Sequence, residues 1–183
     1  AEQHGHMEAV GYDLYCKMLS EAVKEAKGIH TMEDFETTID LNMDAFIPDS
    51  YISNEYQKLD IYKRIAGIET QQDYDDMLEE LLDRFGEMPK AVMNLLSIAR
   101  LKALAHRCYV TEIKQIGRDM KITLYENAKL NPVGFPALMQ KYRRGLQFKN
   151  EQEPKILFTP EGSGNVLTAL TDLLTELEQL VEE

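Results

Sequence analysis

Strong helix-boundary signals near residue 48 limit how this chain can fold more than any other feature of its sequence. Pro48 fixes its own backbone and disfavours helix at Ile47, so an extended segment should end at this point. Asp49 or Ser50 can then cap a helix that begins shortly afterwards. The sequence here predicts a sharp change from extended chain to helix.

A second junction of this kind lies near residue 86. Gly86 directly follows Phe85, and a glycine in such a place is typical of the left-handed conformation that ends a helix. Pro89 suits the first turn of the next helix. We therefore expect a buried Phe85, a positive φ angle at Gly86 and a helix on either side of it.

The spacing of apolar residues predicts the remaining elements. Recurrence every three and four residues indicates helices, and strict alternation indicates half-buried strands. The expected helices cover about 7–26, 53–66, 71–85, 89–107, 132–144 and 164–180. The expected strands cover about 35–43, 110–116, 120–125, 146–149 and 155–159. Helices grouped around separate short antiparallel strand pairs, in the order α-β-α-α-α-β-β-α-β-β-α, indicate an α+β fold.

Charge is distributed unevenly along the chain. The 183 residues carry a formal net charge of −12. Residues 89–150 hold 12 basic and 3 acidic side chains, whereas residues 1–88 hold 7 basic and 21 acidic ones. An acidic protein repels nucleic acid at long range, although the basic segment can still form a local positive face. Internal pairing between the oppositely charged segments is the preferred interpretation.

The sequence favours a soluble, cytoplasmic protein without a membrane partner. No apolar run approaches the roughly 18 residues that span a bilayer, and no charged and then apolar leader is present. Cys16 and Cys108 lie far apart within apolar helical patterns. Buried, reduced thiols are therefore expected at both positions.

We find no constellation of residues typical of a catalytic or metal centre. His4 and His6 lack a carboxylate or thiol at a matching metal-ligand spacing. The aspartates within residues 73–76 point in different directions on a helix, so they cannot converge on one ion. The Gly-rich segment 160–165 lacks the Lys and Ser/Thr of a phosphate loop. We therefore expect no enzyme activity, metal or cofactor in this chain.

Three motifs occur in a fixed order in the first half of the chain. They are Ala45–Ile52 (AFIPDSYI), Tyr62–Ala66 (YKRIA) and Asp83–Pro89 (DRFGEMP). In this order they resemble the C-terminal domain of the bacterial transcription-repair coupling factors. That resemblance implies a full-length protein that uses ATP and Mg²⁺ to translocate on double-stranded DNA, displaces stalled RNA polymerase and recruits nucleotide-excision repair.

The resemblance also reaches the N-terminus. Gln3 matches the glutamine of a translocation motif, although His4 stands where many relatives have a serine. The resemblance then implies that residues 1–30 are the end of the translocase module with a connecting helix. Residues 31–183 would be the C-terminal regulatory domain.

Four acidic residues lie opposite the apolar face of the helix expected at 71–85. They are Asp76, Glu79, Glu80 and Asp83. A stripe of one sign suits an arginine-rich docking surface. The resemblance implies that this domain folds back on the N-terminal module that is similar to the excision-repair helicase subunit, and so masks the surface that recruits the damage-recognition ATPase. Glu80 and Asp83, which lie just ahead of Arg84, are the residues expected to make this contact. A solvated helix face is the simpler alternative.

A DNA-contacting role is the second functional hypothesis. It uses the basic residues near the end of the positive segment, with Tyr142 and Phe148 beside them for base stacking. These basic residues are Lys141, Arg143, Arg144 and Lys149.

Overall fold

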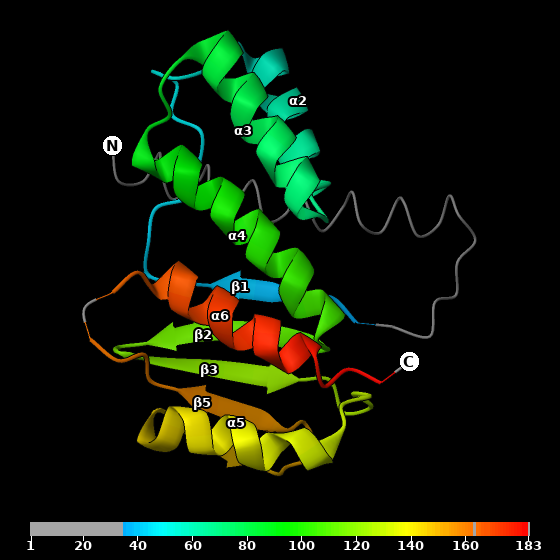
Figure 1. The fold of residues 1–183 in the computed structure, drawn as a ribbon. Helices are drawn as coiled ribbons and strands as arrows, with labels where there is room; N and C mark the ends of the chain where they lie inside the picture. Colours follow the sequence, from blue (N-terminus) through cyan, green and yellow to red (C-terminus); the bar gives the residue numbers. More distant parts are fainter. Residues whose placement is uncertain (1–34, 163, 183) are drawn as a thin grey trace. The chain divides into compact units, whose positions relative to one another are not determined.

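The elements follow one another in the order β1, α2, α3, α4, β2, β3, α5, β4, β5 and α6, with a short 3₁₀ turn on either side of α5 (Figure 1). This computed structural model describes residues 35–162 and 164–182. The observed order confirms the predicted α+β class, and the helix predicted at 7–26 lies outside the described residues. Met43–Arg100 form one unit, called the helical unit below, and Phe35–Asn42 with Leu101–Glu183 form a second, the sheet unit.

The helical unit contains α2 (Glu55–Ala66), α3 (Gln71–Phe85) and the first part of α4 (Lys90–Arg107). The ranges agree closely with those predicted from apolar spacing. Buried apolar side chains from these helices and from the loops before and after α2 form the core of the unit. The core residues are Ile47, Ile52, Ile61, Tyr62, Ile65, Ile68, Met77, Leu81, Val92, Leu95, Leu96 and Ala99.

Helix α2 begins later than its predicted cap. The side chain of Asn54 accepts a hydrogen bond from the backbone N–H of Gln57 at 3.0 Å, which makes Asn54 the N-cap. The prediction that Asp49 or Ser50 caps this helix is therefore wrong. Asp49 instead forms an ion pair with Lys58, a lysine whose side chain is almost fully buried.

The three sequence motifs meet inside the helical unit. The backbone N–H of Ile47 donates to the hydroxyl oxygen of Tyr62 at 2.8 Å, which links the first motif to the second. The hydroxyl of Tyr51 lies 2.8 Å from the carbonyl oxygen of Gly86 and 3.1 Å from that of Leu81, which links the first motif to the third. The fixed order of the motifs therefore reflects one packed junction.

The end of α3 agrees with the sequence in part. Gly86 has φ 85° and ψ −160°, which confirms the predicted positive φ and lies in a region that only glycine adopts readily. Phe85 is half-buried, so the prediction of a buried ring is wrong. It lies at the edge of the core, where Tyr51 packs at 5.9 Å between ring centroids and the Arg84 guanidinium lies 4.9 Å from the ring centre.

One five-stranded sheet forms the centre of the sheet unit. Its spatial order is β1-β2-β3-β5-β4. The strands are β1 (Thr38–Asp40), β2 (Val110–Ile116), β3 (Asp119–Leu124), β4 (Leu146–Lys149) and β5 (Lys155–Phe158). Both predicted hairpins are present, and pairing of β3 with β5 joins them into a single sheet. The first strand pairs parallel to β2, which alternation alone did not indicate.

The sheet has one apolar and one polar face. The register places Ile113, Ile122 and Ile156 side by side, and all three are buried. Helices α5 (Phe135–Tyr142) and α6 (Val166–Glu178) lie against this apolar side (Figure 1). The period of two along each strand therefore produces the predicted half-buried pattern.

The short helix predicted at 132–144 is divided. A 3₁₀ turn at Pro132–Gly134 precedes α5, and Arg143 ends α5 with a φ of 52°. The predicted cap is confirmed, because the Asn131 side chain accepts from the N–H of Val133 at 3.0 Å.

Cys108 is a free and buried thiol in the sheet unit. It donates to the carbonyl oxygen of Leu174 at 3.3 Å, and burial raises its pKa to about 12. This confirms the buried, reduced thiol predicted at this position, whereas Cys16 lies outside the described residues.

Candidate functional site

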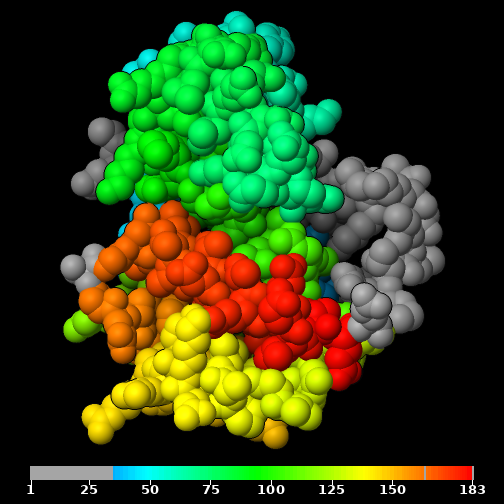
Figure 2. Space-filling view, in the orientation of Figure 1, coloured from blue at the N-terminus to red at the C-terminus, as the bar shows by residue number. Residues whose placement is uncertain are grey.

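The outer side of α3 carries exposed acidic residues, as the sequence predicted. Asp76, Glu79 and Asp83 are exposed, and their spacing of three and four residues places them on one face. None forms an ion pair with a described residue. Asp76 accepts only an amide hydrogen bond from Gln72, at 2.7 Å. Figure 2 shows the α3 segment, in blue-green, at the surface of the molecule. Among the described residues, these three carboxylates thus have no cationic partner.

Glu80 differs from its three neighbours. Its carboxylate forms a bidentate pair with Arg64 of α2, with 2.6 Å between Arg64 Nη2 and Glu80 Oε1, and it also accepts from Arg84 at 3.1 Å. The hydrogen bonds from Arg64 lower the pKa of Glu80 below its usual value. Glu80 therefore joins α2 to α3 within the unit, and its charge is already matched.

Replacing Glu80 with glutamine should lower the free energy of unfolding by about 0.5–1 kcal/mol near neutral pH, as for other partly exposed ion pairs. The depressed pKa means that this contribution is complete above the ordinary glutamate pKa and is lost as the pH falls through the folded-state value. Urea unfolding of both proteins should thus give stabilities that converge below about pH 4. A gap that stays constant into that acidic range would exclude a role for the Glu80 charge.

Leu82 is the residue on this helix that sequence reasoning misplaced. Apolar spacing groups it with the core face, yet 44% of it is exposed, whereas Leu81 beside it is fully buried. On a helix, Leu82 lies one turn from Glu79 and next to Asp83, so it borders the acidic stripe. We call Asp76, Glu79, Leu82 and Asp83 together the acidic α3 surface. The sequence holds no signal that separates Leu82 from Leu81, because both fit the apolar period of the helix.

The basic residues proposed for DNA contact are not equivalent in the structure. Lys141 forms an ion pair with Glu176. Arg143, Arg144 and Lys149 are exposed and form no ion pair with a described residue. Tyr142 packs edge-on against Phe158 at 5.6 Å between ring centroids, and its burial raises its pKa to about 12. Three of the four basic side chains thus lack an acidic partner in the described part of the chain, and the Tyr142 ring is already engaged with Phe158.

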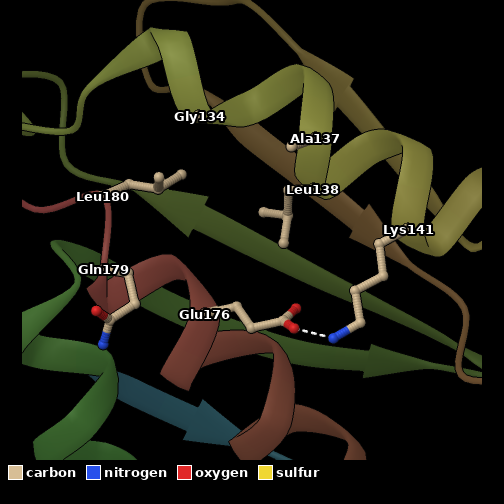
Figure 3. A pocket seen from close by; sticks show the side chains of 7 residues that line it. All are labelled: Gly134, Ala137, Leu138, Lys141, Glu176, Gln179 and Leu180. Atoms are coloured by element: carbon tan, nitrogen blue, oxygen red, sulfur yellow. Dashed lines mark hydrogen bonds and ion pairs between the residues drawn. The ribbon is translucent and has the colours of Figure 1, made fainter.

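A small pocket of about 280 Å³ lies between α5 and α6 (Figure 3). Its walls are mainly apolar, from Leu138 and Leu180 among others, and the Lys141–Glu176 ion pair crosses one side. A Cβ atom at Gly134 would lie 2.0 Å from Leu180 Cδ2, so a larger residue there would force the Leu180 side chain to move. The already neutralised ion pair leaves this pocket without a free charge to select a ligand.

Other sequence-derived candidates have structural roles or fall outside the described part. Asp73 closes a capping box with Thr70 at the start of α3. Within 35–162 and 164–182, no cluster of three or more His, Cys, Asp or Glu side chains is arranged to hold a metal ion. Over the same residues, no helix is long and apolar enough to cross a bilayer. Gln3, His4 and His6 lie outside these ranges.

Comparison with known families identifies the chain. Residues 41–135 match the family model described as the TRCF domain. The chain belongs to the TRCF domain family. This match includes all three motifs on which the resemblance was based, and the resemblance to transcription-repair coupling factors is therefore confirmed.

Curated relatives of this TRCF domain are much longer proteins. The transcription-repair-coupling factor of Bacillus subtilis is 42% identical over 129 residues, which cover 70% of this chain and 11% of that protein. The factor of Staphylococcus haemolyticus is 40% identical over 129 residues, which are 69% of this chain and again 11% of the relative. The chain thus spans about a tenth of the length of these relatives.

The fold also has a counterpart among solved structures. A crystal structure of the C-terminal domain of a transcription-repair coupling factor superposes with a TM-score of 0.68. The alignment covers 80% of this chain and 97% of that one, at 24% sequence identity. At this level of sequence identity, the superposition shows that the two chains share a fold, and no more than that.

Proposed function

We propose that this TRCF domain is a non-catalytic regulatory domain of a transcription-repair coupling factor, and that its acidic α3 surface docks on the repair-helicase-like module of the same protein. In the full-length protein, an ATP-driven motor would translocate on double-stranded DNA and displace stalled RNA polymerase. The docked TRCF domain would cover the surface that binds the damage-recognition ATPase. Release of the domain would then permit recruitment of excision repair.

The free carboxylates of α3 are the observation that supports this proposal. Asp76, Glu79 and Asp83 have no cationic partner among the described residues, whereas Glu80 is neutralised by Arg64 and Arg84. Planar guanidinium groups bind carboxylates bidentately, so an arginine-rich partner surface is the complementary chemistry. Leu82 adds an apolar anchor beside the charges. An apolar contact surrounded by a polar rim is the general arrangement of a protein interface.

Autoinhibition then follows from a two-state equilibrium. The domain is either docked or released, and the damage-recognition ATPase binds only the released state. Its apparent affinity is reduced by the fraction of molecules that are released. A substitution that weakens docking therefore raises the apparent affinity of the ATPase without touching its own binding surface.

Charge reversal of the acidic α3 surface tests the docking step. The triple variant Asp76→Arg, Glu79→Arg and Asp83→Arg should bind the purified repair-helicase-like module about 10- to 100-fold more weakly than the wild type, because an attractive surface becomes repulsive. Isothermal titration calorimetry of the 183-residue chain against that module measures the effect. Since none of these side chains holds an ion pair with a described residue of the unit, the variant should retain its helical circular dichroism.

A matched control reverses three exposed acidic residues of the sheet unit instead. Glu126→Arg, Glu153→Arg and Glu161→Arg produce the same change in net charge, and all three positions are exposed. This control should bind the module with nearly wild-type affinity. Equal weakening in both triple variants would mean that only net charge matters, and the docking surface would not be α3. Unchanged binding in the α3 variant would leave the stripe as a solvated helix face.

The regulatory step needs its own measurement. In a full-length coupling factor that carries this domain, the same α3 triple variant should bind the damage-recognition ATPase more tightly than the wild type. The gain is limited by the ratio of docked to released molecules. Weakened docking without any gain for the ATPase would retain the interaction but exclude the autoinhibitory role.

A further inference from the structure

The edge strand β4 carries backbone groups that no described residue satisfies. In the sheet order, β4 has a neighbour on one side only, namely β5. The backbone N–H of Thr159 donates to the carbonyl oxygen of Gly145 at 2.7 Å, which makes these two residues a hydrogen-bonded pair. Because such pairs alternate along an antiparallel ladder, Gln147 and Lys149 also bond to β5, whereas Leu146 and Phe148 point their backbone groups outward.

The outward groups are sufficient for one more strand. The N–H of Leu146 donates back to the carbonyl oxygen of Arg143. The N–H and carbonyl of Phe148 and the carbonyl of Leu146 have no partner among residues 35–162 and 164–182. An exposed edge with one free donor and two free acceptors can bind an extended peptide by strand addition.

Side chains around the edge define what this peptide should contain. Phe148 is 40% exposed, and its ring packs against Phe135 of α5 at 5.2 Å between centroids. These rings form an apolar rim on the helix-covered side of the sheet. Lys149 lies on the opposite side, because alternate residues of a strand face opposite ways. A strand beside β4 would thus present every second side chain to the aromatic rim and the others to the cation.

The charge along this edge is positive and largely unmatched. Arg143 and Arg144 immediately precede β4, are exposed, and form no ion pair with a described residue. Near Lys149, the carboxylate of Glu151 is held by Lys155 at 2.8 Å. A second copy of this chain would bring its own arginines and lysine to the same place, so like charges disfavour pairing between two β4 edges.

From these contacts we infer that the free edge of β4 binds an extended acidic peptide in which apolar and acidic residues alternate. The apolar side chains pack on Phe148 and Phe135, and the carboxylates approach Arg143, Arg144 and Lys149. This surface lies in the sheet unit and does not involve the acidic α3 surface. The inference therefore stands independently of the proposed regulatory docking.

The test uses a short fluorescein-labelled peptide in which valine and glutamate alternate, titrated with the 183-residue chain and followed by fluorescence anisotropy. Saturable binding is expected. A peptide with lysine in place of glutamate should not bind. N-methylation of the valine amides of the acidic peptide should weaken binding about tenfold or more, because in an antiparallel pair the residues whose side chains lie on the Phe148 side turn their backbone groups toward β4. Equal binding of the lysine peptide or of the N-methylated peptide would overturn the inference.

Variants of the chain locate the binding site. Phe148→Pro removes the outward N–H, whereas Phe148→Ala retains it and removes only the ring. The proline variant should bind about tenfold more weakly than the alanine variant, provided that both have wild-type circular dichroism. Arg144→Glu with Lys149→Glu should weaken binding, and Lys63→Glu with Lys90→Glu, an equal charge change at exposed positions of the helical unit, should not. Equal effects of the two double variants would place the peptide elsewhere.

Nucleic acid is the competing ligand for an edge with exposed cations. A labelled single-stranded oligothymidylate and a labelled duplex, titrated in the same buffer, decide between the two. Binding of either DNA without binding of the acidic peptide would overturn the inference and favour a DNA-contacting surface. Peptide binding that slows hydrogen exchange at the Phe148 amide, observed by NMR, would support strand addition directly.

Discussion

Replacing Leu81 with alanine should destabilise the helical unit by about 3 to 4 kcal/mol, whereas the same change at the next residue should cost less than about 1 kcal/mol. Leu81 is completely buried in the core, and Leu82 is 44% exposed. Truncation of Leu81 therefore removes buried methyl groups and leaves a cavity among well-packed neighbours. Truncation of Leu82 removes groups that are already in contact with water.

The comparison is informative because the two leucines are adjacent on one helix and have identical helix propensity. Native-state hydrogen exchange of the α3 amides measures the helical unit alone, even when the two units unfold in separate steps. Leu82→Ala should also weaken binding to the repair-helicase-like module while leaving the unit folded. Similar losses of stability at both positions would contradict the burial that separates them.

Replacing Gly86 with alanine should destabilise the same unit by about 1 to 3 kcal/mol, the cost of placing a residue with a Cβ atom in a backbone region that is restricted to glycine. The φ angle is 85° and ψ is −160°. A Cβ atom here would find no other atom within 4 Å, so the cost arises from the backbone and not from a clash. Strain at this position should also disturb the hydrogen bond that Tyr51 makes to the Gly86 carbonyl.

Gly67→Ala is the matched control for this strain. Gly67 also ends a helix of the helical unit, but its φ is −86° and an added Cβ would lie 3.5 Å from the nearest atom. Urea unfolding of this variant should give a stability close to that of the wild type. If Gly86→Ala proved as stable as Gly67→Ala, the positive φ at residue 86 would not be essential to the end of α3.

Local patterns in the sequence predicted the elements well, because the signals that begin and end them are carried by a few adjacent residues. Gly86 and Asn131 each occupy the helix-boundary role that their chemistry suggested. Asp49 is not the cap because α2 begins only at Glu55, and the Asp49 carboxylate instead pairs with the buried Lys58. An aspartate that caps a helix and an aspartate that forms an ion pair cannot be told apart from the neighbouring sequence. Only the fold shows which partner lies near the carboxylate.

Sequence predicted the candidate site less completely than the fold. The acidic stripe follows from the helical period, but its division into free and neutralised residues does not. Glu80 is matched by Arg64 from another helix, and that pairing depends on how α2 and α3 pack. Strand pairing is equally hard to predict. The pairing of β3 with β5 joins the two hairpins, but no local sequence pattern in either hairpin indicates it. The sequence therefore could not predict that β4 is an edge strand, because this depends on the order of all five strands in the sheet.

The parallel pairing of β1 with β2 has a consequence for the order in which the chain can fold during synthesis. Thr37 donates to the carbonyl oxygen of Val110, a contact between residues 73 positions apart. During synthesis, β1 therefore cannot pair with β2 until the whole helical unit and β2 have left the ribosome. Closing so long a loop is costly in entropy unless the intervening chain is already ordered. We expect the helical unit to fold first and to shorten the loop that β1 has to close.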